Sequence, residues 1–405
     1  MKKILLSVLT IIGLVLPAVA TTRDANPIPT AMPSLTIAPD AHAAGMGDIG
    51  VATNPDLNSQ HWNPSKYAFM ESKGGITVNY TPWLTKLVTD INLAYIAGYY
   101  NMGDLAGTIS GGFTYFSMGD VQLVGDQGQF FANARPNEWA IDLAYSRKLH
   151  EYLSMAVALR FLYSDLNNGV NSSTNTNSIE MYPAWTMAAD VSLYYRQPIA
   201  TPMGESNLAI GLNLSNLGGK MTYDEGETQH FIPANLRLGL SYELPFDDYN
   251  RLMLSVEANK MLVPTQYSKF AVDADGKPLE GQQLKEWYTE ISSPNGWWMS
   301  FCDAPGHAAS NVSSTLEEFQ EVQWGVGLEY SYNRQFFGRV GYSHENYYKG
   351  NRRYVTLGAG FKLSIFSLDF AYCIATAPSN PLDGTMRFTL GFDLAGIKDL
   401  VNNAK

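Results

Sequence analysis

The chain has 405 residues, of which 45% are hydrophobic and 16% charged, and its formal net charge is −11 at pH 7. A mean hydropathy of −0.14 argues against a bundle of membrane helices, because each such helix needs about 20 consecutive apolar residues. The acidic balance argues against nucleic acid as a partner. The low charge, together with 24 Tyr and 35 Gly, suits a membrane β-barrel that forms one domain.

The N-terminus has the pattern of a signal peptide. Lys2 and Lys3 precede an apolar run from Ile4 to Leu16, and Ala18-Val19-Ala20 offers a small-residue cleavage site. We therefore predict a signal peptide over residues 1–20 and an exported protein. The following residues, 21–73, contain six prolines, which disfavours regular wall strands there.

From about residue 74 onward, the dominant pattern is alternation between two faces. In residues 138–146 (EWAIDLAYS), aromatic and aliphatic side chains fall on one face and Glu, Asp, Ala and Ser on the other. These runs last about 9 to 13 residues, as membrane-spanning strands do, whereas strands of soluble proteins average about 5–6 residues. A soluble β-sandwich is therefore the weaker interpretation, and we predict an all-β fold.

The two faces also differ in charge. The apolar face carries none, as expected for a lipid-facing surface, where Lys or Arg costs about 2–4 kcal/mol at mid-depth. The other face carries acids such as Asp142, Asp190, Glu257 and Asp369, which we expect to pair with Arg160, Arg237 or Arg387 in the lumen. Tyr and Trp gather at the ends of the runs, as in the aromatic girdles of outer-membrane barrels.

Counting the runs predicts a 14-stranded antiparallel transmembrane β-barrel over residues 74–395, followed by a periplasmic tail over 396–405. Connections after even-numbered strands are mostly short and those after odd-numbered strands often long, which predicts periplasmic termini and extracellular loops. The link 197–205 is the exception, being of intermediate length on the short side. The predicted strands are 75–81, 88–101, 105–117, 137–148, 151–165, 184–196, 206–217, 233–244, 250–262, 321–333, 335–347, 351–363, 364–375 and 384–394.

The longest predicted connection, residues 263–320, is expected to be extracellular and partly ordered, because long structureless loops are uncommon. Residues 313–321 have capping-box character and predict a short helix. Aromatic residues are enriched in binding hot spots, although Trp in loops also serves simple packing. The candidate partner-binding residues of this loop are Trp287, Trp297, Trp298 and Phe301.

The sequence contains no recognisable catalytic, metal or cofactor motif. The six His show no HExxH pattern, no GxSxG is present, and Asp273-Ala274-Asp275-Gly276 fails the calcium-loop template. We therefore expect no enzyme activity, no metal and no cofactor. Cys302 in the long loop and Cys373 near a strand end lead to the hypothesis of a disulfide, which an exported compartment permits.

Residues 37–69 (IAPDAHAAGMGDIGVATNPDLNSQHWNPSKYAF) resemble the PorV family, also called LptO, of the type IX secretion system of Bacteroidota. The segment 215–220 (SNLGGK) is a second similar stretch. Gly45-Met46-Gly47 and Trp62-Asn63-Pro64 also resemble, more loosely, the wider superfamily of FadL-like barrels. Ser65, where relatives often have Ala, is a mild departure.

The resemblance implies that residues 21–73, the N-terminal periplasmic or hatch segment, fold into the lumen as a hatch, with Gly45, Met46, Gly47 and Trp62-Asn63-Pro64 as its characteristic residues. Polar backbone at membrane depth is tolerable only inside protein, which favours the same placement over a disordered periplasmic tail. The resemblance further implies an outer-membrane shuttle. It would collect cargo, through the cargo's C-terminal signal domain, from the translocon barrel (SprA or Sov) and deliver it to PorU, PorZ and PorQ.

A second function class remains open, namely a FadL-like outer-membrane transporter of hydrophobic small molecules. It would require a continuous apolar pocket in the lumen and a gap in the wall beside the hatch. The side chains predicted to face the lumen are small and polar, which favours a blocked barrel. The name LptO reflects a proposed role in lipopolysaccharide deacylation, for which the sequence offers no catalytic set.

Overall fold

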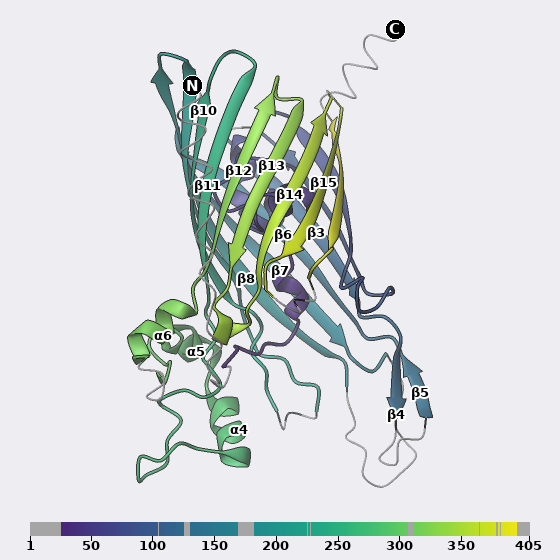
Figure 1. Ribbon diagram of the computed structural model, residues 1–405, viewed down its shortest axis with the longest axis vertical. Helices are drawn as coiled ribbons and strands as arrows, with labels where there is room; N and C mark the ends of the chain where they lie inside the picture. The colour runs from purple at the N-terminus through teal and green to yellow at the C-terminus, as the bar shows by residue number, and fades with distance from the viewer. Residues whose placement is uncertain are drawn as a thin grey trace.

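The computed structural model describes residues 26–103, 105–124, 130–168, 182–224, 226, 228–306, 312–363, 365–377, 380 and 382–394. Within these residues, fourteen antiparallel strands close into a barrel, which confirms the predicted fold class (Figure 1). None of the described helices has the length and hydropathy that a membrane crossing requires. The predicted signal peptide 1–20 and tail 396–405 lie outside the described residues.

The wall strands follow one another around the barrel in chain order, and β1 pairs with β16 to close it. The short hairpin of β4 (Val121–Val124) and β5 (Phe130–Ala134) forms a separate sheet in the connection between β3 and β6 and was not predicted. The wall strands are β1 (Gly74–Pro82), β2 (Asn92–Asn101), β3 (Thr108–Ser117), β6 (Asn137–His150), β7 (Leu153–Asp165), β8 (Ala184–Thr201), β9 (Gly204–Gly218), β10 (Asn235–Pro245), β11 (Asn250–Met261), β12 (Gln323–Tyr332), β13 (Phe336–His344), β14 (Arg353–Lys362), β15 (Phe366–Ala375) and β16 (Met386–Asp393).

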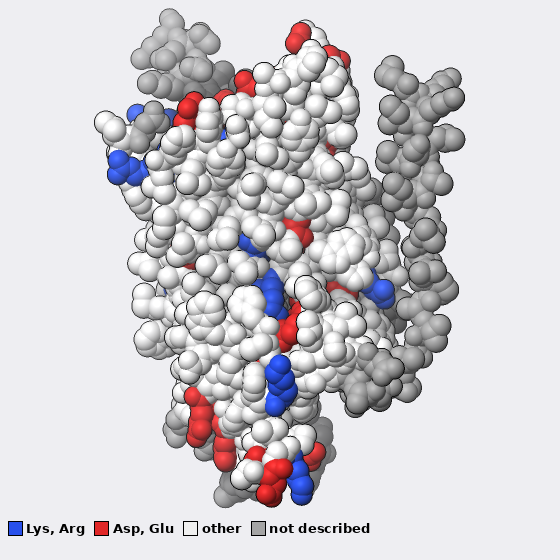
Figure 2. All heavy atoms as spheres, turned by 90° about the vertical axis from the view of Figure 1, so that its left-hand side faces the viewer, with Lys and Arg blue, Asp and Glu red and all other residues white. Residues whose placement is uncertain are grey.

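The alternation in sequence becomes an inside and an outside. In β6, Ile141 and Leu143 are exposed on the outer surface, whereas Glu138 and Asp142 are buried inside. The register of β6 with β7 places Asp142 opposite Arg160, so two lumen charges meet across the strands. On the face shown in Figure 2, uncharged side chains cover most of the wall, and charged side chains appear at the top rim, in a group near mid-height and at the bottom.

The two ends of the barrel differ in their connections. We call the end with the turns 246–249 and 333–335 the short-turn end, and the opposite end the long-loop end. The link after β8 is tighter than expected, because β8 continues to Thr201 and β9 begins at Gly204. This removes the one exception to the alternation of short and long connections.

The long-loop end carries the helices of the connection between β11 and β12 (Figure 1). The predicted helix near 313–321 is present as α6 (Ser314–Gln320), and the Ser313 side chain caps it by accepting from the Leu316 N–H. Two further helices, α4 (Gly281–Glu290) and α5 (Ser293–Met299), were not predicted. We call residues 262–322 the loop module.

Residues 26–73, called here the lumen segment, thread through the inside of the barrel (Figure 1). The backbone N–H of Asn26 donates to Tyr348 O, beside the short helix η5 (Tyr347–Lys349) of the long-loop end. The segment then reaches the short-turn end, where β1 begins. Its short helices are η2 (Pro33–Thr36), α2 (Ala41–Gly45), α3 (Ser59–Trp62) and η3 (Pro64–Phe69).

The first and last described residues therefore lie at opposite ends of the barrel. Asn26 is at the long-loop end, whereas the backbone N–H of Asp393 donates to Ile365 O in a connection of the short-turn end. The sequence predicted both termini on the periplasmic side. The terminal residues themselves lie outside the described residues, and the position of Asn26 at the long-loop end was not predicted.

Candidate functional site

The lumen segment lies against glycines of the wall. A Cβ atom added at Gly341 would come within 2.1 Å of Gly47 N and Met46 C, and one added at Gly211 within 2.0 Å of Val51 O. Distances this short are steric overlaps, so only glycine allows the segment backbone to approach the strands so closely. The segment and the wall are therefore fitted to each other along their backbones.

The predicted residues Gly45, Met46 and Gly47 sit at this contact. Gly45 ends α2 and packs against Gly358 and Arg339 of the wall, while Gly47 has a φ of 85°, a conformation that other residues rarely adopt. The side chain of Met46 is fully buried beside Ile49 and Met253. The Gly-Met-Gly sequence thus turns the chain sharply while it touches β13 and β14.

The predicted Trp62-Asn63-Pro64 sequence forms the second contact. Asn63 caps η3 by accepting from the Ser65 N–H, and Pro64 occupies the first helical turn, where its missing N–H costs nothing. The Asn63 side chain also donates to Leu193 O of β8 at 3.0 Å, and Asn213 of β9 donates to Trp62 O at 2.8 Å. These contacts connect the helix start to the wall.

Asp40 is a site residue that the sequence analysis missed. It is fully buried, accepts from the Ala43 N–H at 2.8 Å as the N-cap of α2, and accepts from the Trp62 indole at 2.6 Å. It therefore joins the two short helices that carry the family-like sequences. An Asp directly before a helical stretch is an N-cap signal, and that signal could have identified it.

Charges in the lumen form a chain between the segment and the wall. His42 of α2 lies 2.8 Å from Asp56 through Nδ1 and 3.1 Å from Glu329 through Nε2. Arg339 donates to Glu329 and to Asp369, each at 2.6 Å. Buried charges are tolerable only when they are paired in this way.

The predicted lumen ion pairs are present in part. Arg160 pairs with Asp190 at 2.9 Å and lies 3.9 Å from Asp142, and Arg237 lies 3.6 Å from Glu257. The prediction for Asp369 was wrong, because Asp369 pairs with Arg339, which was not among the predicted arginine partners. Arg387, on β16, instead reaches the lumen segment and lies 3.5 Å from Asp48. These assignments depend on the strand register, which the sequence pattern does not supply.

A cavity of about 720 Å³ opens beneath the lumen segment at the short-turn end. Its lining is largely polar and charged, with acids such as Glu205 and Glu243 and bases such as Arg251 and Arg334. The cavity is therefore polar in character. It lacks the predominantly apolar lining that small-molecule sites usually have.

The loop module is packed onto the neighbouring connection, residues 219–234. Lys220 donates to the carbonyls of Tyr288 and Thr289 at the end of α4, and the Phe231 ring contacts Tyr288 edge to face. Gly296 of α5 also lies against Phe231, where a Cβ atom would come within 2.6 Å of the ring. These contacts give α4 and α5 fixed positions at the long-loop end.

The four candidate partner-binding residues are not equivalent. Trp298 is the most exposed, at 76%, and Phe301 is exposed at 45%. Trp287 and Trp297 are partly buried within the loop module. Leu316 and Phe319 of α6 are also exposed and were missed. Large exposed apolar side chains of this kind are candidates for a binding surface.

Cys302 and Cys373 do not form the hypothesised disulfide, because both are free thiols. Cys302 is exposed after α5, whereas Cys373 points inward from β15 and packs with Tyr354 and Leu382. A disulfide requires Cα atoms about 4.4–6.8 Å apart and side chains that face each other. The hypothesis rested only on both residues lying at the same end of the barrel, and that location alone does not bring two thiols within bonding distance.

Thiol titration tests the correction. The denatured, unreduced protein should react with two equivalents of a thiol reagent, whereas the native protein should react fast only at Cys302, since Cys373 is buried. A Cys302→Ser variant should therefore lose the fast phase and keep one thiol after denaturation. Absence of free thiols in the denatured protein would contradict the structure.

The chain is similar to known proteins both in sequence and in fold. A family model described as type IX secretion system protein PorV matches residues 20–268. No curated protein matches the chain. Among solved structures, the toluene transporter TbuX of Ralstonia pickettii is 12% identical with a TM-score of 0.45, covering 87% of this chain and 96% of the other. The toluene transporter TodX of Pseudomonas putida is 11% identical with a TM-score of 0.45, covering 86% and 96%. A FadL homologue of Pseudomonas aeruginosa is 12% identical with a TM-score of 0.40, covering 91% and 99%.

Proposed function

Since the chain belongs to the PorV family of type IX secretion system proteins, we propose that it binds and shuttles secreted cargo at the outer membrane. It is an outer-membrane β-barrel component of that system. Its proposed ligand is the C-terminal signal domain of cargo proteins, taken over from the translocon barrel (SprA or Sov). The proposed destination is the attachment complex of PorU, PorZ and PorQ.

The observation that carries the proposal is the contrast between the two parts of the molecule. The lumen segment fills the barrel and is held by buried ion pairs and backbone contacts, which suits a hatch that keeps the lumen closed. The loop module, by contrast, is ordered by its own packing and presents Trp298 and Phe301 to solvent. Exposed aromatic residues on a fixed support lose little conformational freedom on binding.

We propose that the long-loop end faces the outside of the cell and that the short-turn end faces the periplasm. Outer-membrane barrels have short periplasmic turns and longer extracellular loops, and the connections of this chain divide in the same way. In this orientation Trp298 and Phe301 meet cargo that has already crossed the membrane. The lumen segment would enter the barrel from the extracellular side and lead to β1 at the periplasmic side.

The transporter alternative is supported less well. It needs an apolar path for a hydrophobic molecule, yet the cavity at the short-turn end is lined by charged residues such as Glu243 and Arg251. The lumen segment occupies the space above that cavity with side chains such as Lys66, His42 and Asp56. Uptake of a radiolabelled fatty acid or toluene by cells lacking and expressing the protein tests this alternative directly.

The variant Trp298→Ala/Phe301→Ala tests cargo binding. If these side chains are the central contacts, less cargo signal domain should co-purify from detergent-solubilised membranes when both are removed. The expected decrease is at least about tenfold, because a hot-spot residue contributes about 2 kcal/mol or more to binding. Both side chains are exposed, so their truncation leaves the loop module folded.

Phe246→Ala/Tyr249→Ala is the matched control, since these aromatic residues are also exposed, at 48% and 57%, but lie in a turn of the short-turn end. It should retain cargo. Both variants should keep the shift in gel mobility on heating that folded barrels show. Undiminished cargo in the Trp298/Phe301 variant would contradict the proposed surface.

A further inference from the structure

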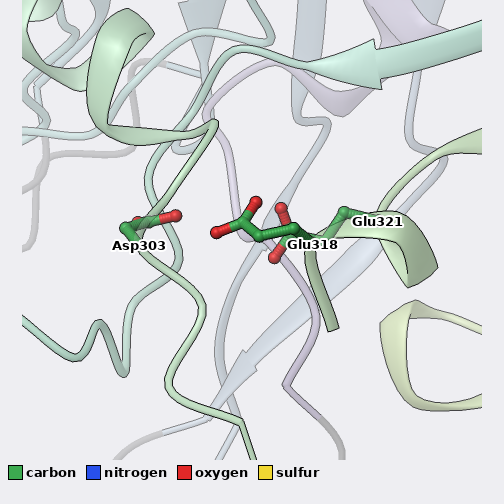
Figure 3. A group of neighbouring side chains, drawn as sticks. All are labelled: Asp303, Glu318 and Glu321. Carbon is green, nitrogen blue, oxygen red and sulfur yellow. The ribbon is translucent and has the colours of Figure 1, made fainter. Parts of the chain in front are cut away.

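Three carboxylates converge where the loop module joins the barrel. Asp303 follows α5, and Glu318 and Glu321 belong to the end of α6. One oxygen from each lies within 4.8 Å of the others, and Figure 3 shows the three groups turned toward one another. Asp303 and Glu321 are buried, and Glu318 is partly buried, with its side chain 13% exposed.

Asp303 lacks the partners that a buried carboxylate normally has. Its Oδ2 accepts from the Thr265 N–H at 2.7 Å, but its Oδ1 is buried and has no hydrogen-bond partner among the described residues. The side chain has no exposed surface and points toward Glu318 (Figure 3). A buried carboxylate in this position is costly unless a further group satisfies it.

Two lysines pair with the glutamates around the site. Lys260 lies 2.8 Å from Glu321 and 3.3 Å from Glu318, and Lys349 lies 2.8 Å from both Glu317 and Glu321. Among the described residues, neither ammonium group forms an ion pair with Asp303. Burial and the nearby Glu321 and Glu318 charges raise the pKa of Asp303 to about 7, so the site disfavours its own negative charge.

We propose that Asp303, Glu318 and Glu321 bind a Ca²⁺ ion that fastens α6 to the chain after α5. Calcium binds oxygen at about 2.3–2.6 Å, so oxygens up to about 5 Å apart can share one ion, and the observed spacing falls within this limit. A divalent ion would satisfy Asp303 Oδ1, which has no hydrogen-bond partner among the described residues. Lys260 would remain beside the ion as a partner of Glu321.

The site differs from the acidic turn at Asp273 and Asp275, which lies elsewhere in the loop module. There, Asp273 is exposed and its side chain already accepts from the backbone N–H groups of Asp275 and Lys277. It therefore offers a matched control of the same residue type. The calcium proposal depends on the loop module alone and is independent of cargo binding.

The test is calcium titration of the EDTA-treated full chain in detergent, followed by calorimetry. Wild-type protein should bind one Ca²⁺ saturably, and both Asp303→Asn and Glu318→Gln should weaken binding at least about tenfold, because affinity depends on the number of charged ligands. Asp273→Asn/Asp275→Asn should bind as the wild type does. Calcium should also slow proteolysis within residues 262–322 of the wild type but not of Asp303→Asn.

Two results would overturn the proposal. One is the absence of saturable binding by the wild type at about 10 mM Ca²⁺, which is above the weakest range known for extracellular calcium modules. The other is unchanged affinity in a folded Asp303→Asn or Glu318→Gln variant. If Asp303→Asn fails to show the heat-dependent gel shift of a folded barrel, Glu318→Gln decides the question, because that side chain is only partly buried.

Discussion

Replacing Gly341 with valine should displace the lumen segment and open the barrel to ions. A Cβ atom at this position would lie 2.1 Å from both Gly47 N and Met46 C, and valine adds two methyl groups beyond it. Neither the segment backbone nor strand β13 can yield by that amount without breaking hydrogen bonds. Ordinary overpacking costs about 1–3 kcal/mol, and this overlap should cost at least as much, because it acts at one of the tightest contacts of the segment.

Single-channel recording in planar lipid bilayers measures this effect. The wild type should show little conductance, whereas Gly341→Val should show large and stable openings, together with faster proteolysis within residues 26–73. Gly338→Val is the matched control, because Gly338 is exposed on the same strand and a Cβ atom there would meet no atom within 4 Å. Wild-type conductance in Gly341→Val would contradict the hatch.

Replacing Arg339 with methionine should destabilise the protein by about 3–5 kcal/mol, which is the usual cost of leaving a buried charge without its partner. Arg339 is buried and donates to Glu329 and Asp369, each at 2.6 Å. Glu329 keeps His42 at 3.1 Å, but Asp369 has no other ion pair among the described residues. Methionine preserves most of the side-chain volume, so the loss is mainly electrostatic.

Urea titration of the protein folded in lipid vesicles, followed by Trp fluorescence, gives the free energy of unfolding. Arg135→Met is the control, since Arg135 pairs with Asp120 but both side chains are more than half exposed. Exposed pairs of this kind contribute only about 0–1 kcal/mol. Equal destabilisation by the two substitutions would show that the lumen pairs have no special role in holding the barrel together.

Much of the fold could be predicted because a membrane barrel imposes a simple rule on every strand. Lipid tolerates no charge, so the outward residues of β6 had to be apolar, and Glu138 and Asp142 had to face inward. The same rule, applied strand by strand, correctly placed the fourteen wall strands. The β4–β5 hairpin and helices α4 and α5 escaped prediction because they lie outside the membrane, where no such rule operates.

The sequence identified residues of the candidate site but not the wall residues that they contact. Gly45-Met46-Gly47 and Trp62-Asn63-Pro64 were recognised from their resemblance to a family, and the structure places both against the wall. Their partners could not be read from the sequence. Gly341 and Gly211 look like ordinary strand glycines until the segment backbone is seen beside them.

The sequence by itself determined the alternation of faces, the number of strands and the family, since these depend on local residue order and on the solvent on each side of the wall. Only the tertiary structure decided which charges pair, because pairing depends on register, as the reassignment of Asp369 to Arg339 illustrates. It also decided that Cys302 and Cys373 stay apart and that Asp303 meets Glu318 and Glu321. Groups distant in the chain meet only when the whole barrel closes, and no local pattern encodes that closure.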